Sequence, residues 1–485
     1  MQKSTKSLFC LMLYCFILFS FIPLLRLSLP MDTQEAIVWG KYCLWGTTKH
    51  PPFSGWFAYD FYKLLGSWDG AMYILSQLCT ACGIFYIYKL ARCFFDENKA
   101  AMAAMLQFGI IYYHFSAIEF NVNVLSVSLW PMCAYYFWKA YTKNKLSDWL
   151  LFGVMVGINL LNKYVSVLLF GSLAIFVFAD KGVWRLLKNI KVYVAFAIAV
   201  AVVAPHLWWM YQTDFETLNY FSSRSGNGAA AWWGHLVYPL KFMFAQILFA
   251  AAMLITYFVL YRKNEKEKRS ENLSEKLFIA VTAIAPICLF ALTSLISGNS
   301  LKSMWGFPCL FMWGSALVYF YPPVFSDNLQ RKLSIVMYVW VSLFAVGYAA
   351  QCLLTTSPRF TTDVKSFSAQ MEEKWQKHTN KPLEYVASDV WYADILALYG
   401  SKEIKPMIWM KPKSNPWFDV DDFNQKGALI IANDDGEYNN YKKMYGADIT
   451  PAQKMTVEFK NYFAKTKVKE ILYGFYLPKE RNNAE

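Results

Sequence analysis

Long apolar segments recur along this chain and constrain its fold more than any other feature. A helix needs about 20 mostly apolar residues to cross a bilayer, and we mark eleven such segments. They lie near residues 7–29, 71–91, 100–118, 121–140, 147–162, 164–180, 191–211, 236–260, 277–297, 303–321 and 333–353. Only Lys163 separates the short fifth and sixth segments, which can also be interpreted as one bent hairpin. Hydrophobic residues make up 56% of the chain, above the roughly 45–50% of soluble domains. The segments predict a mainly α, polytopic membrane protein with about 11 transmembrane helices.

Basic residues predict which side of the membrane each loop faces. They gather in alternate loops, at 89–99, 139–145, 181–191, 262–276 and 331–332. Loops rich in Lys and Arg stay in the cytoplasm, so the net charge of +13 indicates membrane orientation rather than nucleic-acid binding. The first apolar run is longer than that of a signal peptide and lacks a small-x-small cleavage site, so we interpret it as an uncleaved span.

A cytoplasmic start and an odd number of spans place the region after residue 353 on the outer face, together with the loops 30–70 and 212–235. We therefore expect a transmembrane domain over 1–353 and a separate outer domain over 354–485. In the second region, alternating apolar residues predict strands at 384–388, 427–434, 455–460 and 469–477, and residues 389–400 predict a helix that Gly400 ends. The expected outer domain is small and of the α/β type. An inner membrane of a bacterial cell, with this domain in the periplasm, fits the pattern.

Acidic residues directly after the first span are the sharpest functional candidates. Carboxylates near a bilayer are costly unless they are solvated or paired. Asp32 follows the span, and Glu35 lies one helical turn further on, on the same face. The alternative is a capping role, in which Asp32 is the N-cap of a helix and Glu35 its third residue. The two roles are compatible.

Other polar residues fall on the same predicted face. Asn121 and Asn123 open the fourth segment, where amides can also act as helix caps. Lys163 is a lone cation between apolar segments; it either reaches the membrane surface by snorkelling or meets an anionic lipid head group. Arg224 lies among Gly and Ser residues that suggest a mobile loop.

Histidine and cysteine positions do not form a recognisable metal-binding motif. Four of the five histidines, His50, His114, His206 and His235, fall in outer loops or at outer span ends, by chance or because they line a polar cleft. None has a spacing such as H-E-x-x-H. The cysteines lie almost entirely within apolar runs, where they act as small core residues.

Together these residues resemble the GT-C membrane glycosyltransferases of the protein-mannosyltransferase-like group, which includes the aminoarabinose transferase of lipid A. The resemblance covers the whole chain. It rests on an ordered set of motifs: Asp32-Thr33-Gln34-Glu35-Ala36 with Trp39, His50-Pro51-Pro52 with Trp56, Phe120 to Asn123 before Trp130, Lys163-Tyr164, Pro205-His206-Leu207-Trp208, and the stretch Ser388 to Gly400.

The resemblance implies an enzyme that moves a sugar from a polyprenyl-phosphate donor, such as undecaprenyl phosphate, to an acceptor at the outer face. The acceptor class is lipid A, lipopolysaccharide or a similar glycolipid, with no nucleic-acid partner. The implied catalytic residues are Asp32 and Glu35. The implied donor-phosphate ligands are Lys49, His50, Lys163 and Arg224, and the implied acceptor- or sugar-binding residues are Glu119, Asn121, Asn123 and His206.

The chain departs from the family pattern at its acidic motif. The usual Asp-Glu pair reads Asp32-Thr33, with the glutamate displaced to Glu35, and Glu119 or Asn123 stands where some relatives carry an acid. No metal ligand or cofactor is assigned, and use of a divalent metal stays open. Two other functions share the many spans: a transporter or flippase of a lipid-linked substrate, and a protein O-mannosyltransferase. A transporter favours internal repeats and midplane charges, which the sequence does not display clearly.

Overall fold

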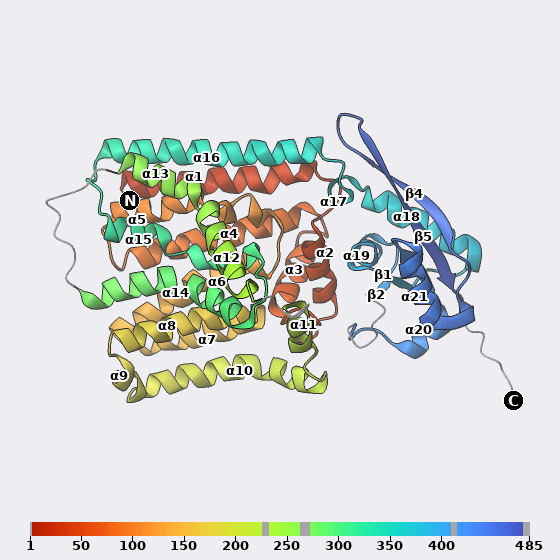
Figure 1. The fold of residues 1–485 in the computed structure, drawn as a ribbon, viewed down its shortest axis with the longest axis horizontal. Coiled ribbons are helices and arrows are strands. Elements are labelled where there is room, and N and C mark those ends of the chain that lie inside the picture. The colour runs from red at the N-terminus through yellow and green to blue at the C-terminus, as the bar shows by residue number, and fades with distance from the viewer. Residues whose placement is uncertain (1, 226–231, 262–271, 409–414, 479–485) are drawn as a thin grey trace. The chain divides into compact units, whose positions relative to one another are not determined.

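The computed structural model describes the whole chain except residues 1, 226–231, 262–271, 409–414 and 479–485 (Figure 1). The chain divides into two compact units. The helical unit comprises Met1–Ile22, Lys49–Phe53 and Tyr73–Tyr348. The mixed unit comprises Pro23–Thr48, Ser54–Met72 and Ala349–Glu485, so most of the first loop shares a unit with the C-terminal region.

The helical unit is built from helices throughout its described part. Its α-helices are α1 (Lys3–Phe21), α4 (Gly70–Ala91, entered from the mixed unit), α5 (Glu97–Met105), α6 (Val122–Lys143), α7 (Leu146–Asn162), α8 (Val167–Ala179), α9 (Val183–Leu187), α10 (Ile190–Gln212), α11 (Glu216–Ser225), α12 (Gly234–Phe249), α13 (Ala251–Leu260), α14 (Leu273–Ser297), α15 (Trp313–Phe320) and α16 (Asp327–Leu354, which ends in the mixed unit). Short 3-10 turns lie at Leu106–Gly109, Ile111–Tyr113, Ser116–Ile118, Tyr164–Ser166 and Ser303–Leu310. In Figure 1, α1, α14 and α10 run along one common direction.

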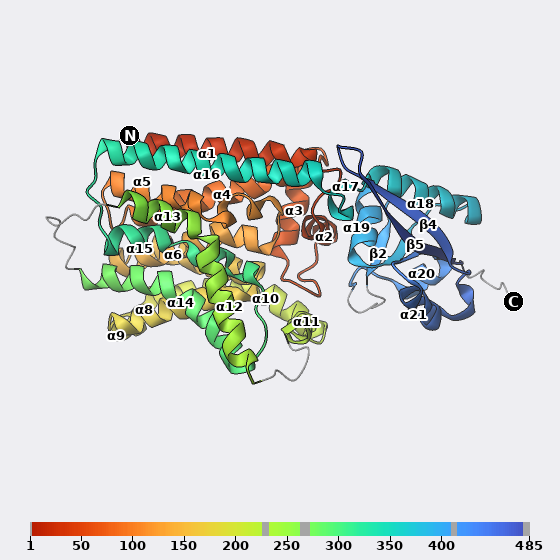
Figure 2. The same cartoon turned by 45° about the horizontal axis from the view of Figure 1, so that its top comes forward.

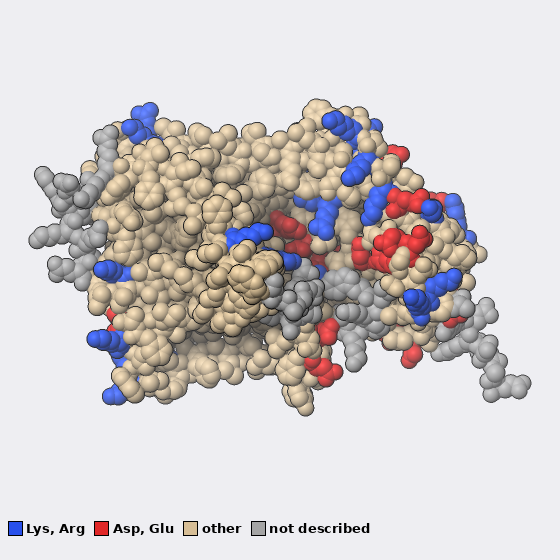
Figure 3. Space-filling view, viewed as in Figure 1, with Lys and Arg blue, Asp and Glu red and all other residues tan. Residues whose placement is uncertain are grey.

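Every predicted apolar segment is helical, but the segments are not all simple spans. By length and composition, five helices of the described part could cross a membrane, or up to seven if each bent pair forms one span. The segment predicted at 100–118 is broken by 92°. The segment predicted at 303–321 consists of a 3-10 stretch that contains Pro308, followed by the short α15. The chain is a multi-pass membrane protein, while the count of eleven spans stays a prediction. Figure 3 shows a broad band without charged side chains on the helical unit, next to basic residues at the end that carries α9.

Small residues allow the helices to approach closely, as is common between membrane helices. Gly153 and Gly157 of α7 face α10. A Cβ added at Gly153 would lie 2.4 Å from the carbonyl oxygen of Ala195, and one added at Gly157 would lie 2.6 Å from the side chain of Val202. This Gly-x-x-x-Gly spacing fixes α7 against α10.

The mixed unit contains a five-stranded sheet in the order β2-β1-β3-β5-β4. Its strands are β1 (Tyr385–Ser388), β2 (Lys405–Ile408), β3 (Ala428–Ala432), β4 (Gln453–Lys460) and β5 (Thr466–Tyr476). The first three are parallel, and β5 is antiparallel to β3 and β4. The four predicted strands are confirmed, as is the helix predicted at 389–400. Strand β2 was missed.

Helices cover both faces of this sheet (Figure 2). The helices of the unit are α2 (Met31–Lys41), α3 (Phe53–Leu64), α17 (Pro358–Thr361), α18 (Val364–Thr379), α19 (Val390–Tyr399), α20 (Val420–Lys426) and α21 (Asp435–Tyr445). The side chains of α18 and α19 pack in one core with the alternate strand residues Val386, Leu429 and Ile431. Those of α20 and α21 pack in a second core with Ala387 and Ile430. The two cores follow from the period-2 pattern of the strands.

Helices α2 and α3, which the first loop contributes, pack through two glycines. A Cβ on Gly40 would lie 2.0 Å from the carbonyl oxygen of Gly55. Backbone atoms cannot move aside as a flexible side chain can, so any larger residue at position 40 must push the two helices apart.

We expect Gly40→Ala to lower the free energy of unfolding by about 2 kcal/mol or more, because overpacking of this kind forces a backbone shift. Gly347→Ala is the matched control, since Gly347 is also helical and an added Cβ there meets no atom within 4 Å. Thermal unfolding in one detergent measures both. A melting temperature for Gly40→Ala equal to that of the wild type would contradict the close packing of α2 and α3.

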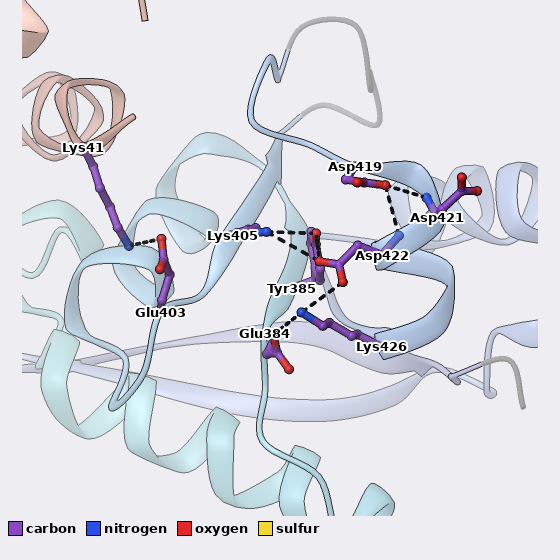
Figure 4. A network of polar contacts seen from close by, with 9 residues as sticks. All are labelled: Lys41, Glu384, Tyr385, Glu403, Lys405, Asp419, Asp421, Asp422 and Lys426. Atoms are coloured by element: carbon purple, nitrogen blue, oxygen red, sulfur yellow. Dashed lines mark hydrogen bonds and ion pairs between the residues drawn. The ribbon is translucent and has the colours of Figure 1, made fainter. Parts of the chain in front are cut away.

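A network of charged residues links β1, β2 and α20 (Figure 4). The Tyr385 hydroxyl donates a hydrogen bond of 2.6 Å to Asp422. Lys426 lies 3.0 Å from Asp422 and 2.6 Å from Glu384, and Lys405 lies 3.5 Å from Asp422. The hydrogen bond from Tyr385 and the two lysines hold the pKa of Asp422 below its usual value. The ionised carboxylate therefore stabilises the folded unit.

This stabilisation is present above the ordinary pKa of an aspartate, about 3.9, and is lost as the pH falls through the lower folded-state pKa. We expect Asp422→Asn to cost about 1 kcal/mol at pH 7 and the difference from the wild type to shrink near pH 3. Asp421→Asn is the control, because its side chain is exposed in the same helical turn. Hydrogen exchange of β1 against pH measures the effect. A loss of stability in Asp422→Asn that is the same at pH 7 and pH 3 would refute the stabilising role of the ionised Asp422 carboxylate.

Candidate active site

Lys163 is directed at Asn123 rather than only at solvent. It follows the last residue of α7 and is half-buried. Its Nζ donates a hydrogen bond of 2.5 Å to Oδ1 of Asn123, which is 3% exposed in the first turn of α6. The structure thus brings together a predicted donor-phosphate ligand and a predicted sugar ligand. A lysine that only snorkels to the membrane surface would not donate this hydrogen bond to a buried amide.

Buried amides of α7 hold this arrangement in place. Nδ2 of Asn162 donates to the carbonyl oxygen of Val122 and to Oγ of Ser126, both at 2.9 Å. Nδ2 of Asn159 donates to the carbonyl oxygen of Leu129 at 3.2 Å. Buried hydrogen bonds of this kind are costly to leave unmade, so they fix α7 against α6 directly before Lys163. We did not predict these residues, although their positions were a usable signal: Asn159 lies one helical turn before Lys163, and Asn162 directly precedes it.

Asn121 caps helix α6, which was the alternative to a role in sugar binding. Its Oδ1 accepts hydrogen bonds from the backbone N–H groups of Asn123 (2.9 Å) and Val124 (3.3 Å), and the residue is the N-cap of α6. The cap fixes the turn that carries Asn123. Glu119, predicted as a sugar ligand, lies two residues earlier and is half-buried.

His206 is fully buried in α10 and is paired with Tyr164. Nε2 of His206 and the Tyr164 hydroxyl are 2.6 Å apart. The imidazole ring is also stacked with Trp209, with ring centroids 5.8 Å apart. Because Tyr164 follows Lys163 in the chain, His206 supports the segment that carries the lysine. The pairing of Tyr164 was not predicted.

Lys49 and His50 are half-buried and precede the buried Pro51 and Pro52. They belong to the helical unit, as do Lys163 and His206. Arg224 lies in α11, so the loop predicted around it is helical up to Ser225. The side chain of Arg224 is outside the described part of the structure.

Asp32 and Glu35 share helix α2, in the mixed unit. The N-cap of α2 is Pro30, so the alternative in which Asp32 caps the helix is wrong: the helix begins one residue before Asp32. Asp32 lies in the first turn, half-buried, where the positive end of the helix dipole favours a carboxylate. Glu35 is 4% exposed. Asp32 is therefore the more accessible of the two acids, and Glu35 is an internal residue of the unit.

Three contacts attach the first loop to the C-terminal region within the mixed unit. The Lys41 ammonium lies 3.2 Å from the Glu403 carboxylate (Figure 4). The ring of Tyr42 is stacked on Trp417, with centroids 4.7 Å apart. The Tyr399 hydroxyl donates a hydrogen bond of 2.9 Å to the Asp69 carboxylate. Helix α19 packs directly against α2.

Burial raises the pKa of the Asp69 carboxyl, and the hydrogen bonds from Tyr399 and Tyr62 act in the opposite direction. These contacts were not predicted, because 330 residues separate Tyr399 from Asp69 and no local pattern relates them. They attach the first loop, which includes the helix that carries Asp32, to the C-terminal region of the mixed unit.

Three other histidines have structural contacts. His114 is fully buried, with Nε2 3.1 Å from the carbonyl oxygen of Phe108. Nδ1 of His235 lies 2.7 Å from the carbonyl oxygen of Leu295. His378 is stacked on Phe475. Within the described ranges, no three His, Cys, Asp or Glu side chains are grouped so that they could hold a metal ion.

The helical unit carries the candidate cations and hydrogen-bond donors, and α2 of the mixed unit carries the candidate carboxylates. An ammonium held by an amide oxygen retains protons that can be donated to a phosphate. A carboxylate in the first turn of a helix can accept a proton from a hydroxyl.

One family model matches part of the chain. Residues 49–209 match the family model described as dolichyl-phosphate-mannose-protein mannosyltransferase, which is about a third of the chain. The matched region contains Lys49, His50, Asn123, Lys163 and His206.

Two curated relatives come from Rhizobium johnstonii. The lipopolysaccharide core galacturonosyltransferase RgtA is 25% identical over 283 residues, covering 54% of this chain and 55% of the relative. The lipopolysaccharide core galacturonosyltransferase RgtB is 22% identical over 238 residues, covering 48% of each. The chain therefore spans about half the length of the curated relatives it matches.

Solved structures of ArnT from Cupriavidus metallidurans share the fold over nearly the whole chain. The form bound to undecaprenyl phosphate has a TM-score of 0.62 and 13% identity, covering 96% of this chain and 97% of ArnT. The apo form has a TM-score of 0.53 and 11% identity, covering 99% and 100%. The fold implied by the sequence resemblance is confirmed: this chain is a multi-pass membrane protein with the GT-C fold of ArnT.

Proposed function

We propose that this chain is an integral-membrane glycosyltransferase that moves a sugar from a polyprenyl-phosphate donor to lipopolysaccharide or a similar glycolipid. The names of RgtA and RgtB support the acceptor class. The undecaprenyl phosphate in the ArnT structure supports the donor class. The matched family model favours a second candidate acceptor, a protein hydroxyl.

The observation that carries the proposal is the contact of Lys163 with Asn123 at 2.5 Å. It holds an ammonium group at the junction of α7 and the following turn, inside the region that matches the family model. A phosphate is a good leaving group once its charge is stabilised, and a fixed cation provides this stabilisation without reorganisation. Lys49, His50 and Arg224 are the further candidate ligands.

The proposed reaction is a direct displacement at the anomeric carbon. An acceptor hydroxyl attacks, the bond to the donor phosphate breaks, and the polyprenyl phosphate leaves with the bonding electron pair. Asp32 takes the proton of the hydroxyl, and a single displacement inverts the anomeric centre. If the acceptor is itself a phosphate, it is already ionised and Asp32 only orients it. Glu119, Asn121, Asn123 and His206 orient the sugars, Asn121 and His206 through their neighbours.

The proposed location is the inner membrane of a bacterium, with the first loop and the C-terminal region in the periplasm. The distribution of basic residues supports this orientation. Polyprenyl-phosphate sugars are then consumed at the face where lipopolysaccharide sugars are accessible.

The test uses the full chain in liposomes with three labelled sugar donors: a polyprenyl-phosphate sugar, the same sugar on a nucleotide, and the free sugar. We expect label to reach a lipopolysaccharide core acceptor only from the lipid-linked donor. Transfer to a hydroxyl-containing peptide instead would favour the second candidate acceptor. Movement of the intact donor across the bilayer without any transfer would identify a transporter and refute the proposal.

A further inference from the structure

The hairpin between β4 and β5 presents two aromatic side chains at its tip. Tyr462 is 56% exposed and Phe463 is 65% exposed. The turn itself is well braced, because Oδ1 of the buried Asn461 accepts hydrogen bonds from the backbone N–H groups of Phe463 and Lys465, both at 3.0 Å. The exposed rings therefore result from a fixed turn conformation.

Two hydrogen bonds locate this tip at the ends of apolar helices. Nδ2 of Asn461 donates to the carbonyl oxygen of Leu354, the last residue of α16, at 2.8 Å. The Tyr462 hydroxyl donates to the carbonyl oxygen of Leu25 at 3.0 Å. Leu25 and Leu354 are the last residues of two candidate membrane spans. The tip consequently lies at the level where these spans leave the hydrocarbon core.

The charges around the tip are of one sign. Lys460, Lys465 and Lys467 are exposed, and no acidic residue occurs between positions 459 and 469. Apolar surface continues around the ends of the spans, where Leu354 is 60% exposed and Leu27 is 48% exposed. Aromatic rings with neighbouring lysines are the composition that favours the head-group layer of an anionic membrane.

We propose that the β4–β5 tip inserts Phe463 and Tyr462 into the head-group layer of the membrane that the chain spans, with Lys460, Lys465 and Lys467 bound to phosphates of anionic phospholipids. This membrane contact holds the C-terminal region at the bilayer surface. It does not depend on the proposed transfer reaction, so either can fail without the other.

The experiment places the photo-crosslinker p-benzoylphenylalanine at Phe463 in the full chain. The protein is reconstituted in nanodiscs of phosphatidylethanolamine and phosphatidylglycerol. The control carries the same residue at Met444 of α21, which is 48% exposed. We expect phospholipid adducts at position 463 in at least about tenfold excess over position 444, identified by mass. Unchanged thermal unfolding confirms that both variants fold.

A second variant tests the lysines. We expect Lys460→Gln, Lys465→Gln and Lys467→Gln together to lower the share of phosphatidylglycerol among the adducts about threefold or more, because lysines near the bilayer surface attract anionic lipids. An equal yield of lipid adducts at positions 463 and 444 would overturn the membrane contact. Adducts to glycolipid or protein alone at position 463 would also overturn the membrane contact. An unchanged share of phosphatidylglycerol among the adducts of the lysine variant would refute the role of the lysines.

Discussion

Asp32→Asn is expected to lower kcat for sugar transfer at least about a hundredfold, because a positioned general base contributes a factor of 100 to 10,000. Asparagine has nearly the same shape as aspartate but cannot accept the proton of the acceptor hydroxyl. Asp32 occupies the first turn of α2 and is half-buried, so the substitution leaves no cavity in the core of the unit. The apparent KM for the donor should stay within about twofold if Asp32 acts on the acceptor.

Asp60→Asn is the matched control, since Asp60 is an exposed carboxylate on α3 of the same loop. It should retain full activity. Glu35→Gln distinguishes catalysis from support: Glu35 is almost completely buried, so its loss should reduce thermal stability as well as activity. Full transfer activity in Asp32→Asn would remove Asp32 from the catalytic role.

Lys163→Ala is expected to weaken binding of the polyprenyl-phosphate donor by about tenfold to a hundredfold, since a charge-assisted hydrogen bond to a phosphate is worth about 1.5–3 kcal/mol. The measurement is equilibrium binding of polyprenyl phosphate to the protein in nanodiscs. Asn123→Ala should weaken binding less, because it removes the group that orients the ammonium and leaves the charge in place.

The double variant Lys163→Ala/Asn123→Ala should bind no more weakly than Lys163→Ala alone, since both substitutions act through one contact. Lys188→Ala is the control, because Lys188 is an exposed lysine in the connection before α10. Unchanged donor affinity in Lys163→Ala would refute the proposed role of Lys163 in donor binding.

Local sequence patterns predicted the helices and strands better than the positions where these elements bend or are interrupted. The helix α19 could be predicted from its ends, since the Asp389 side chain accepts a hydrogen bond from the backbone N–H of Tyr392 and Gly400 follows the last turn. Strand β2 was missed because it contains Pro406, which interrupts a strand pattern. Proline is tolerated there because β2 is an edge strand, which only the sheet order reveals.

The candidate residues were predictable individually, but their partners were not. Lys163 and Asn123 are 40 residues apart, and Tyr164 and His206 are 42 apart. Their contacts arise from the packing of α6, α7 and α10, which depends on buried amides and glycines whose partners lie on other helices. The alternative of a capping role for Asp32 is wrong for a smaller reason: the N-cap of α2 is Pro30, two residues earlier.

The most direct test of the account follows both products of the proposed reaction in one time course. Wild-type protein in liposomes receives a polyprenyl-phosphate sugar labelled in the sugar and in the lipid, together with a lipopolysaccharide core acceptor. We expect glycosylated acceptor and unsubstituted polyprenyl phosphate to form in equal amounts, and Asp32→Asn and Lys163→Ala to reduce both together. Sugar transfer without release of polyprenyl phosphate, or release that continues unchanged without acceptor, would contradict it.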